Sequence, residues 1–157
     1  MKIQILFALV IFPFLNCKEK SIPKTIEKQS IELVSLPPEE KIDENRLIGF
    51  GCYFSGRKSE PVKVMGKLLT KKDYIGIRAK LSAKSTAERY LATAVCTTLE
   101  AKKVISLTPS EQTRIKQNMM SPDKVVFCSG CTFEEEFTMK ELLASGHLNN
   151  WLKEMIQ

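Results

Sequence analysis

The stretch of residues 85–99 limits most strongly what this chain can fold into. It opens with Ser85-Thr86-Ala87-Glu88, the spacing of a capping box, in which the serine side chain accepts from the glutamate amide and the glutamate reaches back. The following residues place small or apolar side chains on one helical face: Ala87, Leu91, Ala94, Val95, Thr98 and Leu99. We expect a helix at the centre of the core, with Cys96 lying off this face.

Five further helices are predicted from periodicity and end signals. Residues 60–69 and 74–81 repeat apolar side chains at helical spacing, and the short polar break between them predicts an antiparallel pair. A second capping box at residues 108–111 opens a polar surface helix, and a third at residues 138–141 opens a short helix. The last helix places its apolar side chains at i, i+3, i+4 spacing: Leu148, Trp151, Leu152, Met155 and Ile156.

The remaining segments of the domain are extended. Residues 47–57 are apolar and aromatic, but Gly49, Gly51 and Gly56 disfavour a helix there. Residues 124–127 form a short strand that leads into Cys128. The fold class predicted is therefore mainly α: a small helical domain of stacked helix pairs with one short extended or strand segment.

The start of the chain has the layout of a secretory signal. Lys2 precedes an apolar run at residues 5–12, which is shorter than the 20 or so residues that a bilayer span needs. Phe14-Leu15-Asn16-Cys17 then resembles the lipobox of bacterial lipoproteins. Asn16 differs from the Gly, Ala or Ser usual there and fits the looser boxes of spirochaete lipoproteins.

This resemblance implies a signal peptide at residues 1–16 and lipidation of Cys17. It places the protein in the cell envelope, at the outer membrane, on the periplasmic face or at the surface. Residues 17–45 are polar and proline-punctuated, which is typical of a flexible tether. Residues 46–157 then form the helical domain, a length suited to a single core.

A second resemblance concerns the helices between residues 60 and 107. Asp73, Ile77, Arg78 and Leu81, followed by Tyr90-Leu91-Ala92, resemble helical-repeat units of the HEAT type. The resemblance implies stacked, solenoid-like helix pairs, although no clear period repeats across the rest of the chain.

Four cysteines remain besides Cys17, and export to an oxidising compartment favours disulfides. We expect Cys128 to pair with Cys131 and Cys52 with Cys96, although four cysteines allow three connectivities. The Cys128-Ser129-Gly130-Cys131 motif could instead serve thiol redox chemistry, or the four cysteines could bind zinc. Glu134, Glu135 and Glu136 would disfavour a thiolate, and only one CxxC is present, so neither alternative is preferred.

Positive charge is segregated along the chain. Residues 57–84 contain nine basic residues and only two acidic ones, Glu60 and Asp73, while the whole chain carries +6. Lys63 and Lys67 stack on one helical face, and Lys71 continues the row. This row is either a solvated helix face or a patch that binds anionic membrane phosphates, lipid-A-like head groups or sulfated polymers.

No catalytic arrangement is visible. His147 is the only histidine, and it is expected at the surface or near a helix end. The sequence therefore offers no other histidine for a Ser-His-Asp or Cys-His site. We expect no enzyme activity, metal or cofactor, and no nucleic-acid partner. The function expected is a membrane-anchored binding or interaction module for an anionic lipid, a polysaccharide or an envelope protein. The alternatives are a structural envelope component and a thiol-redox protein that uses Cys128 and Cys131.

Overall fold

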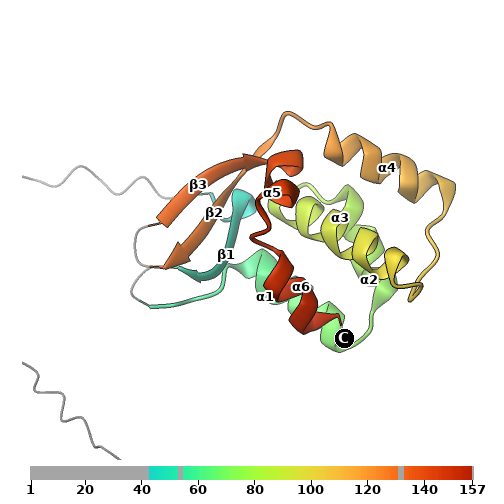
Figure 1. Cartoon of the computed structure of the whole chain (residues 1–157), viewed down its shortest axis with the longest axis horizontal. Helices are drawn as coiled ribbons and strands as arrows, with labels where there is room; N and C mark the ends of the chain where they lie inside the picture. Colours follow the sequence, from blue (N-terminus) through green and yellow to red (C-terminus); the bar gives the residue numbers. More distant parts are fainter. Residues whose placement is uncertain (1–42, 53–54, 131–132, 157) are drawn as a thin grey trace, which may run out of the picture. The chain divides into compact units, whose positions relative to one another are not determined.

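The chain is mainly helical, as predicted, and a small sheet stands at one end of the helices (Figure 1). The computed structural model describes residues 43–52, 55–130 and 133–156. The predictions for the signal peptide, for Cys17, for most of the tether and for Cys131 lie outside these residues. In chain order the elements are η1 (Glu44–Arg46), β1 (Leu47–Cys52), α1 (Glu60–Thr70), α2 (Tyr74–Ala79), η2 (Lys80–Ser82), α3 (Thr86–Ala101), α4 (Pro109–Met119), β2 (Lys124–Gly130), β3 (Phe133–Thr138), α5 (Met139–Ser145) and α6 (Asn149–Met155).

Helix α3 is the centre of the core, as its sequence predicted. All of residues 90–96 are buried, so Cys96 lies inside the core even though it is off the apolar face. The predicted capping box is only half formed. Ser85 Oγ accepts from the Glu88 amide at 3.2 Å, but the Glu88 carboxylate pairs with Lys80 Nζ at 2.6 Å instead of reaching back.

The two other predicted capping boxes form completely. Thr108 and Glu111 exchange side-chain and backbone hydrogen bonds at the start of α4, and Thr138 and Glu141 do so at the start of α5. Helix α5 ends at Gly146, whose φ of 76° is the left-handed conformation that glycine adopts without strain. These helix starts and stops were predictable because all the signals are local in the sequence.

Helices α1 and α2 pack against each other and against α3. Asp73, one of the residues behind the HEAT resemblance, caps α2 by accepting from the Gly76 amide at 2.9 Å. Helix α4 is polar and lies at the surface, as predicted, but it is held by the buried side chain of Asn118. That amide donates to the Leu81 carbonyl at 3.1 Å and to Thr93 Oγ1 at 3.0 Å.

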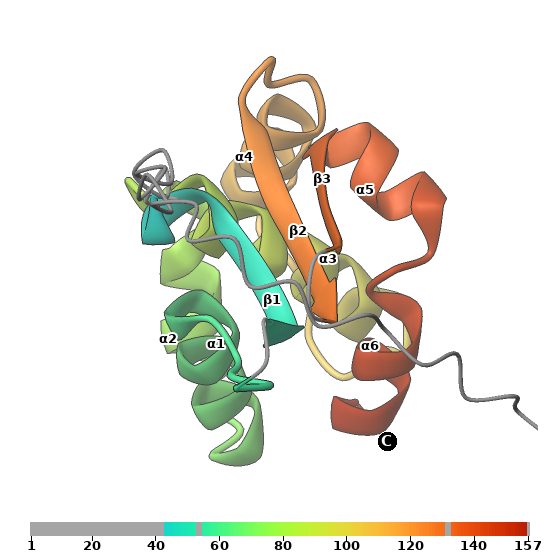
Figure 2. The ribbon, with the colours of Figure 1, turned by 90° about the vertical axis from the view of Figure 1, so that its left-hand side faces the viewer.

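The sheet has the strand order β1-β2-β3, with β1 parallel to β2 and β2 antiparallel to β3. Figure 2 shows the three strands side by side in front of α3. Because successive side chains of a strand alternate between faces, the sheet contributes apolar side chains to two separate hydrophobic clusters. The inner face adds Ile48, Val125, Phe127 and Phe137 to the main core, and the outer face gathers Leu47, Cys52, Val126 and Cys128.

Strand β3 was not expected. Glu134, Glu135 and Glu136 lack the alternation of a half-buried strand, yet they pair with Cys128, Phe127 and Val126 of β2. All three glutamates are exposed, and among the described strands β3 pairs only with β2. The predicted strand at residues 124–127 therefore continues to Gly130 and forms the middle of a sheet.

Candidate functional site

The predicted lysine row lies on the exposed side of α1. Pro61, Val62, Met65 and Leu69 bury the opposite side of this helix in the core. Lys63 and Lys67 are exposed on α1, and Lys71, the residue that ends it, is exposed in helical backbone conformation and continues the row. Lys63 Nζ lies 3.3 Å from Glu60 Oε2. Among the described residues, Lys67 and Lys71 have no acidic side chain within ion-pairing distance.

The row borders a groove between α1 and α6, which we call the basic groove. Its rim consists of Lys58, Lys63, Lys67 and Lys71, and its floor of Val62, Gly66, Thr70, Trp151 and Met155. The volume is about 430 Å³. No acidic side chain of the described residues lines it. The sequence predicted a basic patch or a solvated helix face, and the structure adds apolar side chains beside these lysines.

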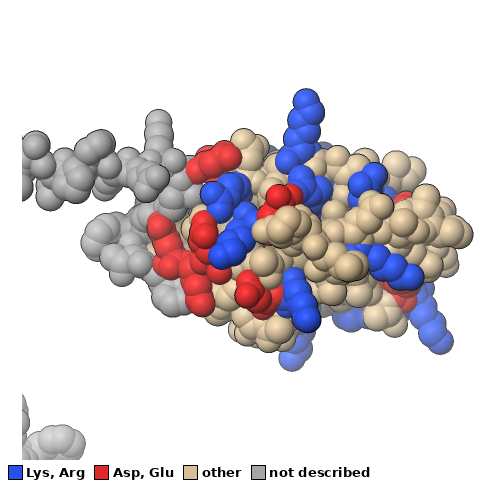
Figure 3. All heavy atoms as spheres, turned by 90° about the horizontal axis from the view of Figure 1, so that it is seen from above, with Lys and Arg blue, Asp and Glu red and all other residues tan. Residues whose placement is uncertain are grey.

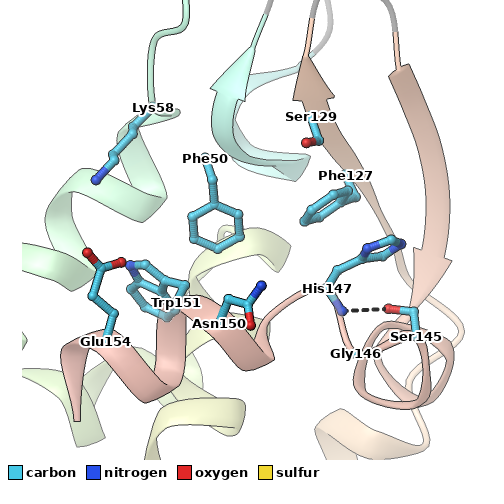
Figure 4. Close-up of a pocket in the computed structure, with 10 residues that line it drawn as sticks. All are labelled: Phe50, Lys58, Phe127, Ser129, Ser145, Gly146, His147, Asn150, Trp151 and Glu154. Atoms are coloured by element: carbon cyan, nitrogen blue, oxygen red, sulfur yellow. Dashed lines mark hydrogen bonds between the residues drawn. The ribbon is translucent and has the colours of Figure 1, made fainter. Parts of the chain in front are cut away.

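A second hollow, the aromatic hollow, is also lined by Trp151 and has a volume of about 560 Å³ (Figure 4). Phe50 of β1 packs on Trp151 at a ring-centroid distance of 5.3 Å, and on Phe127 of β2 at 6.0 Å. The His147 ring stacks on Phe127 at 4.4 Å. In Figure 4, Phe50 and Phe127 extend from the sheet, Trp151 extends from α6, and His147 extends from the turn that precedes α6.

Polar groups surround the aromatic hollow. Ser129, Ser145, Asn150 and Glu154 line it, and the His147 amide donates to Ser145 Oγ at 3.3 Å. Lys58 lines both hollows, as does Trp151. Trp151 was expected to plug the core, and it is buried, at 7% exposure. That Trp151 lines two hollows and that His147 stacks on an aromatic ring were not expected.

The predicted cysteine pairing was wrong. The structure joins Cys52 to Cys128, with Cα atoms 5.5 Å apart, and leaves Cys96 as a free thiol. The reason is the parallel pairing of β1 with β2, which brings Cys52 and Cys128 together on the outer face of the sheet. Cys96 belongs to the main core on α3, so it does not reach Cys52. Gly49 makes room for the bond, because a Cβ there would lie 2.1 Å from Cys52 Sγ.

This arrangement differs from that of a thioredoxin-like CxxC. Cys128 lies within β2, and β3 begins at Phe133, so no helix start follows the first cysteine. Burial raises the pKa of the Cys96 thiol to about 12, which disfavours its thiolate. Within the described residues, no group of three or more His, Cys, Asp or Glu side chains is placed to hold a metal ion.

The basic groove is one region of a surface of mixed charge. Figure 3 shows another face, on which acidic side chains gather toward the end of the molecule where the sheet lies. Among the described residues, none of the helices has the length and apolar character needed to cross a membrane. Comparison with protein-family models, with curated proteins and with solved structures finds no match to this chain.

Proposed function

We propose that this chain is an exported envelope protein, anchored by lipid at Cys17, whose domain binds anionic lipid head groups without catalysis. The observation that carries the proposal is the basic groove. Four exposed lysines from one segment of chain border it, and no acidic side chain of the described residues lines it. Such a concentration of positive charge, in which Lys67 and Lys71 have no ion-pair partner among the described residues, attracts phosphate and carboxylate groups.

The energy available suits a reversible contact. A Lys or Arg near an anionic bilayer contributes about 1 kcal/mol, and this attraction fades beyond about 8 Å at physiological salt. The ion pair of Lys63 with Glu60 lowers the share of that lysine. As a flexible tether, residues 18–45 would span roughly 30 Å, so an anchored domain would meet the membrane at high effective concentration. Weak affinity of the domain itself is then sufficient.

Vesicle binding tests the head-group contact. The full chain with Cys17→Ser, which cannot be lipidated, would be sedimented with neutral vesicles and with vesicles containing anionic lipid. Changing Lys63, Lys67 and Lys71 together to Glu should weaken binding to anionic vesicles by about 100-fold, because each lysine contributes about 1 kcal/mol. Binding through the N-terminal apolar run is common to all variants and cancels in this comparison.

A matched control separates position from net charge. Arg114 and Lys116 on α4 and Lys140 on α5 are also exposed, and changing all three to Glu alters the charge by the same amount. This control should bind anionic vesicles within about threefold of the parent, since its charges lie away from the groove. Equal weakening of both triple variants would refute the proposal. Retention on heparin at a salt concentration that releases the vesicles would assign the row to a sulfated polysaccharide instead.

The anchor is tested separately in cells. Radiolabelled palmitate should enter the parent chain, and globomycin should make its unprocessed precursor accumulate. The Cys17→Ser chain should carry no label, and label that persists in it would overturn the assignment of Cys17. Proteolysis of intact cells then distinguishes the cell surface from the periplasmic face.

A further inference from the structure

We infer that the basic groove takes up one acyl chain of an anionic lipid, with the lipid's charged group held by the lysine rim. This inference rests on the proposed function and adds to it the part of the lipid that enters the protein. A patch that binds only head groups needs charge but no apolar floor. The groove has both, which matches an amphiphile with one anionic end.

The floor is apolar and its walls belong to different elements. Val62 of α1 and Trp151 of α6 are almost fully buried, at 2% and 7% exposure, and Met155 of α6 packs partly buried beside them. Methionine is flexible and adapts to irregular apolar ligands. The rim lysines can lay their methylene stems along such a chain while their ammonium groups stay in water. The volume of about 430 Å³ falls within the range of about 300–1,000 Å³ typical of ligand sites.

Gly66 is a second, independent observation. It is the only glycine of α1, and it lies within the helix, where alanine would be more favourable. A Cβ added there would meet only Met155 Cε, at 4.0 Å, so the protein itself does not fill the space above Gly66. The missing side chain keeps the groove open between Val62 and Thr70.

Trp151 gives a direct readout, because it is the only tryptophan of the chain and lines the groove. A single-chain carboxylate carrying a doxyl spin label should quench Trp151 fluorescence saturably, below its critical micelle concentration. The uncharged methyl ester of the same chain should bind at least tenfold more weakly. Each CH₂ removed from the chain should weaken binding by at most about fourfold, and the series should level off once the chain exceeds the groove.

Filling the groove without touching the lysines separates the inference from the proposed function. Gly66→Leu places a side chain over the floor, and Thr70→Phe fills one end from an exposed position, which keeps the test valid if the first variant does not fold. Both should lose at least tenfold in affinity for the labelled carboxylate while their binding to anionic vesicles stays within about threefold. Circular dichroism checks that each variant is folded.

The outcomes are distinguishable. Unchanged carboxylate affinity in a folded Gly66→Leu chain and in Thr70→Phe would overturn the acyl-chain inference and leave the head-group proposal standing. Undiminished vesicle binding by the Lys63, Lys67 and Lys71 triple variant would overturn the proposed function itself. If Asn150→Phe, which obstructs the aromatic hollow without adding a second tryptophan, removes quenching while Gly66→Leu does not, the chain enters that hollow and the inference is wrong.

Discussion

The disulfide between Cys52 and Cys128 should account for a large part of the stability of this domain. It joins neighbouring strands that are 76 residues apart in the sequence. In the chain-entropy account, closing a loop of that length removes about 15 cal/mol/K from the unfolded state, which is about 4.5 kcal/mol at 25 °C. A domain of this size is stable by only about 5–15 kcal/mol, so loss of the bond should be easy to detect.

Urea unfolding of the parent and of the Cys52→Ala, Cys128→Ala double variant measures this contribution. With a denaturant dependence of about 2 kcal/mol/M, the midpoint of the double variant should fall by about 2 M. Reductant should lower the parent to a similar midpoint and leave the double variant unchanged. Cys96→Ala is the matched control, because it removes a buried thiol outside the bond, and it should keep the full response to reductant.

A substitution at Gly49, which lies next to the sulfur of Cys52, tests the same disulfide. Gly49→Ala would place a Cβ 2.1 Å from Cys52 Sγ, so the oxidised chain should be destabilised more than the reduced chain, in which the sulfur can move. Peptide mapping without reductant should recover Cys52 joined to Cys128. A parent insensitive to reductant, or Cys52 recovered with Cys96 or Cys131, would refute the reasoning.

Three other predictions concern single side chains. Gly66→Ala should raise the free energy of unfolding in urea by about 0.5–1 kcal/mol, because it removes an interior glycine from α1 and makes only an ordinary contact with Met155; a loss of stability would contradict the open space described there. Cys96 should not react with iodoacetamide in the folded protein at pH 8 and should react after unfolding, because burial raises its pKa to about 12; mass spectrometry measures this, and labelling of the folded chain would contradict it. Hydrogen bonds from Thr108 lower the pKa of Glu111 below its usual 4.5, so its ionised form stabilises the fold above that pH and this contribution is lost as the pH falls through the lower folded value. Glu111→Gln should therefore show a smaller fall in melting temperature on acidification below about pH 4.5 than the parent, and an identical fall would exclude this role.

The helices were predictable because their signals are local. An apolar face, a capping serine or threonine and a terminating glycine all lie within a few residues of the helix that they define. The capping box at Ser85 shows the limit of prediction from local sequence signals. Its serine caps α3 as expected, but Glu88 pairs with Lys80, a residue of η2, at 2.6 Å. Competition from a neighbouring element decides the partner of an otherwise ordinary capping glutamate.

The sheet and its disulfide were not predictable in the same way, because strand pairing is long-range. Nothing near Cys52 in the sequence indicates that β1 will lie beside residues 126–130. The glutamates of β3 even argue against a strand, and they are tolerated because the strand is at an edge and they remain exposed. The predicted Cys52–Cys96 bond was wrong for this reason. The partner of Cys52 depends on which strand lies beside β1, and the spacing of the cysteines in the sequence does not reveal that strand.

The difference between local and long-range signals also explains which parts of the candidate site could be predicted. The lysine row follows from four-residue spacing on a helix, and its exposure on α1 agrees with that spacing. The groove beneath the row does not follow, because its second wall is α6, some 80 residues further along the chain. Sequence reasoning placed Trp151 correctly in the interior but had no means of showing that the same ring lines two hollows.

The position of α6 depends on contacts that this seven-residue helix cannot supply alone, since isolated helices this short are not stable in water. Trp151 packs on Phe50, and the carbonyl of Ile156 accepts from Lys102 at the end of α3. Phe50 packs on the main core at the inner face of β1. The register of β1 with β2 shifts between Gly49 and Gly51, which interrupts the alternation of side chains, so Cys52 lies on the outer face and is bonded to Cys128. The bond therefore holds the strand on which the groove-lining tryptophan rests. The oxidising compartment that the proposed export would provide favours the bond and, through β1, a fixed wall for the basic groove.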